Sequence, residues 1–209
     1  MPPALAVPHK LTALTDLPAL LTASEGWPEL LAALRARRSG TIDGAWGSSA
    51  ALAAAGLARE APSVLLVVIP HIADLEQWAL DLASFAGERP TTFPAWETWP
   101  PEATAGPDPV AAERLRVLQR LAGGPPRLLL TTPAALMQPV PSPEELAARG
   151  RRVRTGETLD PEAFARWLVD QGYRRVEAVA FPGDFSARGG ILDVWSIDAE
   201  VPFRVELFG

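Results

Sequence analysis

The sequence predicts an α/β domain with a parallel sheet over residues 1–141, followed by a smaller α+β domain with an antiparallel sheet over residues 142–209. Short apolar strands alternate with amphipathic helices in the first part, which is typical of a parallel sheet with helices on its faces. The pattern changes after residues 139–141, where helix starts are followed by short strands and short turns. The length of 209 residues accommodates one or two such domains.

Helix and strand patterns alternate along the first part. Residues 11–38 predict a helical region with breaks, in which Pro28 suits a helix start and Gly40 follows the end. Residues 64–69 are apolar throughout, which is typical of a strand that is buried on both faces. The other expected elements are a short strand at 41–43, helices at 50–59, 71–85 and 109–121, a Pro-rich loop at 87–109, a strand at 127–132 and a short helix from Pro133.

Local signals define two helices in the second part. Ser142, Pro143 and Glu145 have the spacing of a capping box with proline in the first helical position. Another helix begins at residues 160–162, and Gly172 fits the position just after its last turn. The strands expected next are residues 173–181, 191–197 and 203–208, separated by turns at 182–184 and 198–200.

The composition excludes several classes of site. The chain has no Cys, which excludes disulfides, thiolate metal ligands and a Cys nucleophile. Its only histidines are His9 and His71, so a His-based metal cluster is excluded as well. The net charge of −6 argues against a chain whose main task is to coat nucleic acid or an anionic membrane. No spacing supports a catalytic triad, and we expect no metal and no cofactor.

The sequence contains no candidate membrane segment. The first ten residues have no basic region before an apolar stretch. The longest apolar run, 64–69, ends at Pro70 and falls far below the roughly 20 residues that a membrane span needs. We therefore expect a cytoplasmic protein without membrane contact.

The loop before the helix at 50–59 can be aligned with the phosphate-binding P-loop pattern. Ala50 and Ala51 stand where that pattern has the Lys that reaches the phosphates and the hydroxyl that binds Mg²⁺. The only lysine of the chain is Lys10. We expect no ATP hydrolysis and interpret the loop mainly as a tight turn, with weak anion binding at the helix start left open. The residues of this degenerate loop are Gly44, Gly47, Ser48, Ser49, Ala50 and Ala51.

Two strands of the second part carry charged residues on one face. Arg204 and Glu206 alternate with apolar residues and point away from them. By the same alternation, Asp193 and Trp195 share a face. If that face is open, Trp195 beside arginine side chains has the composition of a protein-binding hot spot. The alternative is that Trp195 lies in the core and Asp193 is satisfied locally, and the residues alone favour neither.

A run of arginines lies between the two helices of the second part, at positions 149, 151, 152 and 154. Acidic neighbours dilute this run, and residues 143–209 carry a net charge of −3. We interpret the run as a solvated strand edge rather than a nucleic-acid site.

Residues 181–195 and 203–209 resemble the signature shared by the bacterial transcription–repair coupling factors (Mfd) and the excision-repair protein UvrB. Residues 107–115, 130–136 and 168–173 fit as well, so the similarity covers nearly the whole chain.

Two features separate the chain from UvrB, which has an intact P-loop with Lys and a Tyr-rich hairpin that grips DNA. Here the P-loop is degenerate, the loop at 93–100 is short, and Tyr173 is the only Tyr. The chain therefore resembles the N-terminal UvrB-like module of the coupling factors, a degenerate RecA/helicase-like domain with a smaller domain behind it.

The resemblance implies a non-catalytic module that recruits UvrA through its second domain. RNA polymerase and double-stranded DNA are implied as partners of parts of the full-length family protein beyond Gly209, so we expect this chain to be a fragment. Ser186 stands where the family has another Arg. The implied UvrA contacts are Arg175, Arg188, Arg204 and Glu206, with Phe185 and Trp195 beside them.

Two other functions stay open at this point. One is a UvrB-like enzyme that verifies DNA damage with ATP, against which the missing P-loop Lys argues. The other is an intramolecular clamp that keeps the UvrA-binding face covered in the full-length protein, which is compatible with recruitment.

Overall fold

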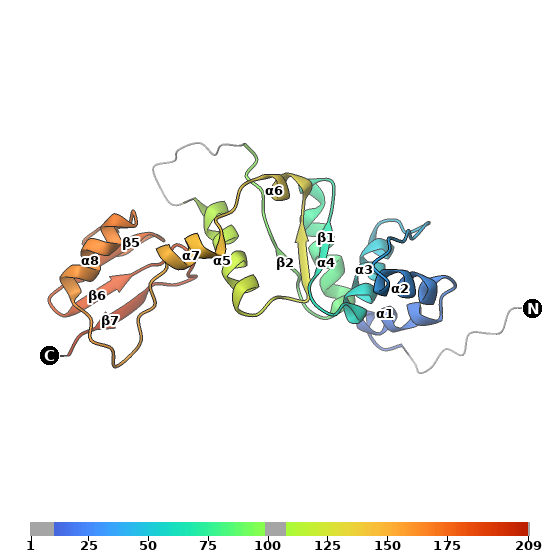
Figure 1. Cartoon of the computed structure of the whole chain (residues 1–209), viewed down its shortest axis with the longest axis horizontal. Helices are drawn as coiled ribbons and strands as arrows, with labels where there is room; N and C mark the ends of the chain where they lie inside the picture. The colour runs from blue at the N-terminus through green and yellow to red at the C-terminus, as the bar shows by residue number, and fades with distance from the viewer. Residues whose placement is uncertain (1–10, 99–107, 209) are drawn as a thin grey trace, which may run out of the picture. The chain divides into compact units, whose positions relative to one another are not determined.

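The computed structural model of the chain describes residues 11–98 and 108–208. The chain divides into two compact units, Met1–Ala95 with Gly123–Met137, and Trp96–Ala122 with Gln138–Gly209 (Figure 1). Each unit holds its own sheet, one parallel and one mixed, which confirms the expected α/β class with a separate second sheet. The domain boundary between residues 141 and 142 stays a prediction.

The first unit begins with short helical segments, as the sequence predicts. Trp27 is buried at the start of its helix and packs against the next long helix at Gly56. A Cβ on Gly56 would lie 2.6 Å from Leu21 Cδ1 and 3.0 Å from the Trp27 ring, so glycine allows this close approach without displacing either side chain. The segments are η1 (Leu14–Asp16), α1 (Leu17–Leu20), η2 (Leu21–Ala23), α2 (Trp27–Arg35) and α3 (Ser48–Glu60).

Three parallel strands form the sheet of the first unit in the order β1-β3-β2. They are β1 (Leu65–Val68), β2 (Thr91–Thr92) and β3 (Leu128–Thr131). Helices α3 and α4 (Leu75–Ala86, preceded by η3, Ile72–Asp74) cover one face (Figure 1). Ile69, Leu82, Leu128 and Leu130 form the centre of this core, with small alanines from both helices that let the layers approach. The short helix α6 (Pro133–Met137) follows β3.

Three predictions for this unit were wrong. Residues 41–43 are irregular rather than a strand, and Asp43 instead accepts a hydrogen bond from the Gly44 N–H at 2.9 Å. Strand β2 lies inside the expected loop, where prolines on both sides limit it to two residues. Strand β1 is buried on one face only: Leu66 and Val68 are each 45% exposed, because the core formed with α3 and α4 takes up Leu65 and Val67.

Helix α5 (Pro109–Gly123) belongs to the second unit. Its Arg114 is buried, with the guanidinium carbon 4.5 Å from the centre of the Trp96 ring. Arg114 also donates to the carbonyl of Pro139 at 3.2 Å, and burial lowers its pKa. Arg114 therefore links α5 to Trp96, which precedes this helix in the sequence, and to Pro139, which follows it. Neither α5 nor any other helix within residues 11–98 and 108–208 is both long and apolar enough to cross a membrane.

The predicted helix starts of the second unit are confirmed. In α7 (Pro143–Arg149), the Ser142 hydroxyl and the Glu145 carboxylate form the reciprocal capping box. Asp160 accepts hydrogen bonds from the first turn of α8 (Pro161–Asp170). Gly172 has φ = +86°, the left-handed conformation expected just after a helix.

The second sheet has four strands in the order β4-β5-β6-β7. They are β4 (Arg174–Arg175), β5 (Asp184–Arg188), β6 (Ile191–Val194) and β7 (Phe203–Glu206). Strands β4 and β5 are parallel and the other neighbours antiparallel, so the sheet is mixed rather than purely antiparallel. Helix α8 packs on one face (Figure 1). The core on that face consists of Phe164, Leu168, Phe185, Leu192 and Val194.

The strand at 173–181 was predicted too long, and β5 was not predicted. Only residues 174–175 pair, because the chain then leaves the sheet, and β5 takes the central place between β4 and β6. The turn signal at Pro182 and Gly183 lies directly before β5, and for this reason Asp184, the first residue of β5, was assigned to a turn. The strands expected at 191–197 and 203–208 exist but end at Val194 and Glu206.

We expect Phe185→Ala to lower the free energy of unfolding of the second unit by about 3–5 kcal/mol, because it empties the centre of the core under α8. Ile191→Ala, on the opposite face of the neighbouring strand, should cost less than about 1 kcal/mol. Urea unfolding measures both variants. Equal losses would contradict the assignment of the two faces.

Candidate protein-binding face

Strands β5, β6 and β7 present one face that α8 does not cover. Side chains alternate along each strand, so the residues between those of the core point the other way. The register places Ser186 beside Asp193, and Asp193 beside Arg204. We call this surface the outer face; its residues are Ser186, Arg188, Ile191, Asp193, Arg204 and Glu206.

The segment after β4 borders the outer face. The carbonyl of Glu177 accepts hydrogen bonds from the Ser186 hydroxyl, at 3.1 Å, and from the Arg188 guanidinium. Both donors lie on the outer face, so residues 177–179 are held along its rim. Arg188 is therefore oriented before any partner arrives, while its side chain remains exposed.

A buried carboxylate fixes the same segment. Asp184 is 3% exposed, and its Oδ2 accepts from the backbone N–H of Phe181 at 3.0 Å and of Ala180 at 3.3 Å. Its Oδ1 accepts from Arg174 Nε at 3.0 Å. Burial on its own would raise the pKa of Asp184, but the hydrogen bonds from Arg174 and the two backbone N–H groups outweigh it and lower the pKa.

Asp193 and Arg204 form a two-point ion pair across β6 and β7. Arg204 Nε lies 2.6 Å from Asp193 Oδ1, and Arg204 Nη2 lies 2.9 Å from Oδ2. This hydrogen bonding lowers the pKa of Asp193, against the opposing effect of burial, and raises the pKa of Arg204. The Arg204 side chain is 57% exposed and that of Asp193 30% exposed, so the pair is open to solvent.

A hollow of about 640 Å³ lies on the outer face. Its walls are residues 177–179 on one side and 202–204 on the other. Ile191 and Phe203 add apolar surface, and Arg188, Asp193 and Arg204 add charge. A hollow lined by both apolar and charged side chains has a composition that is common at protein-binding surfaces.

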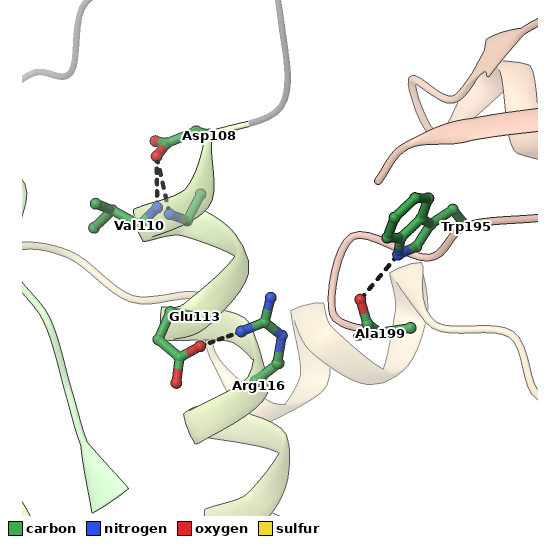
Figure 2. A network of polar contacts seen from close by, with 7 residues as sticks. Asp108, Val110, Glu113, Arg116, Trp195 and Ala199 are labelled. Carbon is green, nitrogen blue, oxygen red and sulfur yellow. Dashed lines mark hydrogen bonds and ion pairs between the residues drawn. The ribbon is translucent and has the colours of Figure 1, made fainter. Parts of the chain in front are cut away.

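Trp195 follows β6 and is half-buried. Its burial is therefore intermediate between the exposed and the core position that the sequence left open. Its indole Nε1 donates to the carbonyl of Ala199 at 3.1 Å (Figure 2). The polar atom of Trp195 is thus satisfied within its own unit. Figure 2 also shows Asp108 accepting from the first turn of α5 and Glu113 paired with Arg116.

Two further expected contact residues, Phe185 and Arg175, lie on the α8 side of the sheet. Phe185 is fully buried under α8, so it has no surface to offer a partner, and its assignment as a contact is corrected. Arg175 is in register with Phe185 and lines a separate hollow together with Asp170 and Ala165 of α8. Arg188, Arg204 and Glu206 are brought together as expected.

The loop aligned with the P-loop pattern is closed by its own hydrogen bonds. The Ser49 hydroxyl accepts from the Trp46 N–H at 2.8 Å and donates to the Trp46 carbonyl at 2.7 Å. Gly44 and Gly47 have positive φ, Ser48 begins α3, and Ala50 and Ala51 follow in its first turn. Because residues 41–43 are not a strand, the strand–loop–helix context of a P-loop is not formed. Within the described part of the chain, no three His, Asp or Glu side chains gather as a metal site.

Comparison with known proteins places the outer face in a recognised domain. The model of the UvrB interaction domain family matches residues 152–209, which contain all four strands of the second sheet. This part of the chain is therefore similar to the UvrB interaction domain. The sequence-based resemblance is thereby confirmed.

Relatives extend the similarity to most of the chain. The transcription-repair-coupling factor of Bacillus subtilis is 29% identical over 168 residues, or 80% of this chain. Those of Mycobacterium bovis and Haemophilus influenzae are 32% identical over 78% and 27% identical over 76% of the chain. The matched region is 14% of the length of each of these relatives.

Two features that stabilise the outer face, the buried Asp184 and the segment 177–179, were not identified from the sequence. Asp184 was assigned to a turn, and residues 177–179 to a regular strand. The pairing of Asp193 with Arg204 was not predicted either, although the clean alternation of β7 was a signal for it. All of these groups lie within residues 152–209, which match the model of the UvrB interaction domain family.

We expect Asp184→Asn to lower the free energy of unfolding by about 1–3 kcal/mol at pH 7, because the buried hydrogen-bonded charge is lost. The folded-state pKa of Asp184 is below its ordinary value of 3.8. Its stabilising contribution is therefore complete above that value and is lost as the pH falls through the folded-state pKa. Denaturant unfolding from pH 7 down to pH 3 should show the wild type converging on the variant. The exposed Asp74→Asn is the control, and a difference independent of pH would contradict this role.

Proposed function

We propose that this chain is a non-catalytic recruitment module of nucleotide excision repair coupled to transcription, and that it binds UvrA through the outer face of the UvrB interaction domain. The observation that carries the proposal is the open outer face, where Arg188 and Arg204 are exposed on a sheet whose other face is filled by α8. The similarity to transcription-repair-coupling factors supports the repair context. RNA polymerase and double-stranded DNA would then be partners of other parts of a longer protein.

Arg188, Arg204 and Glu206 form the centre of the proposed contact, with Trp195 at its edge. Arg175 lies on the α8 side of the edge strand β4. A partner that touches Arg175 and Arg204 together must therefore extend around the β4 edge. The effect of an Arg175 substitution on UvrA binding would therefore show whether the contact extends beyond the outer face.

We expect Arg204→Glu to weaken UvrA binding by about tenfold or more and Arg188→Ala by a smaller factor, because both remove oriented donors from the contact. Isothermal titration calorimetry with purified UvrA measures the affinities, and circular dichroism checks that the fold is kept. Arg166→Ala, an exposed arginine of α8, is the matched control. Undiminished affinity of both outer-face variants would remove the assignment.

We further propose that the first unit is a degenerate RecA/helicase-like domain without ATP turnover. Its parallel sheet, with α3 and α4 packed on one face, supports the likeness. The Lys and hydroxyl that grip nucleotide are replaced by Ala50 and Ala51, and the nearby Ser49 hydroxyl is engaged with Trp46.

We expect an equilibrium titration of this chain with Mg²⁺ and ATP to show no micromolar binding, because the contacts to the β- and γ-phosphates are missing. Saturable binding that depends on Mg²⁺ would instead favour a UvrB-like ATP-dependent protein.

A further inference from the structure

Arg204 uses only one side of its guanidinium within the chain. Its Nε and Nη2 donate to the two oxygens of Asp193. A guanidinium has five N–H groups, so the end formed by Nη1 and the second Nη2 hydrogen still has donors to offer. The side chain is 57% exposed and borders the hollow, so that end is accessible to a partner.

The position of Arg204 is fixed by Asp193. The two residues are directly opposite in the antiparallel register of β6 and β7. A two-point pair aligns the planar guanidinium in a way that a single contact does not. Each oxygen of Asp193 accepts one hydrogen bond from Arg204, so a partner's acid meets a guanidinium that needs no rearrangement.

The charges of the outer face nearly cancel. Arg188 and Arg204 are offset by Asp193 and Glu206, which also act electrostatically on their neighbours. A general positive field therefore does not explain recognition at this surface. Directional hydrogen bonds from an oriented arginine do, and a carboxylate is the group whose geometry matches the free end.

We propose that Asp193 is a positioning residue, which holds Arg204 so that its free end binds a carboxylate of the partner at the hollow of the outer face. This inference rests on the proposed function and names the chemistry of the partner group. Ile191 and Phe203 provide the apolar surface on which the segment bearing that acid rests.

The test uses the whole chain and purified UvrA, with dissociation rates from surface plasmon resonance. We expect Asp193→Asn to weaken binding about fivefold, mainly through faster dissociation. Arg204→Lys keeps the charge but lacks the planar end, so it should lose as much affinity as Arg204→Ala. In the Arg204→Ala background, Asp193→Asn should have no further effect. Asp74→Asn, in the other unit, is the charge-matched control.

A measurement without UvrA separates this inference from the proposed function. In ¹⁵N NMR of the free chain, the Arg204 Nε–H should exchange slowly in the wild type and rapidly in Asp193→Asn. Failure of the wild type to bind UvrA would overturn the proposed function and the inference with it. Wild-type binding together with unchanged or tighter binding by Asp193→Asn, full binding by Arg204→Lys, or rapid Nε–H exchange in the wild type would overturn the inference alone.

Discussion

The packing of α8 on one face of the four-stranded sheet is the constraint on which the outer face depends. Phe164 and Leu168 fill the space over Phe185, Leu192 and Val194. The pleat of the strands then sends every intervening side chain to the opposite side. A shift of one residue in the register of β5 or β6 would turn Ser186 or Asp193 toward α8 and turn the core residues of that strand away from it. The apolar side thus specifies where the polar side lies.

The polar side is held by hydrogen bonds that cross between neighbouring segments. Arg174 binds Asp184, Arg188 binds the carbonyl of Glu177, and Arg204 binds Asp193. Each of these contacts is weak in stability terms where it is exposed to solvent. These contacts restrict the long side chains before binding, so less conformational entropy is lost when a partner binds. A surface with little net charge can in this way still be selective.

Local chemistry made the helix starts of the second unit predictable. The capping box of Ser142 and Glu145, the cap at Asp160 and the glycine at position 172 depend on residues within four positions of one another. The faces of β6 and β7 were predictable for a similar reason, because alternation is a local pattern. The exposed position of Arg204 and Glu206 followed from it.

Pairing between distant segments was not predictable in this way. Strand β5 contains Asp, Ser and Ala, which have low strand propensity, and it is a strand because it has partners on both sides. The burial of Phe185 and the separation of Arg175 from the outer face follow from that missed strand. In the first unit, the exposed face of β1 had the same origin, since an apolar run does not reveal how many faces are covered.

The central claim is that UvrA contacts the outer face rather than the α8 side, and the absence of Cys allows it to be tested with single introduced thiols. Ile191→Cys places a thiol in the outer hollow, and Val169→Cys places one on the exposed side of α8. The alkylation rate of each thiol is measured by mass spectrometry with and without UvrA. We expect UvrA to slow alkylation of the Ile191→Cys chain and leave the Val169→Cys chain unchanged. Protection at position 169 alone, or at neither position, would contradict the account.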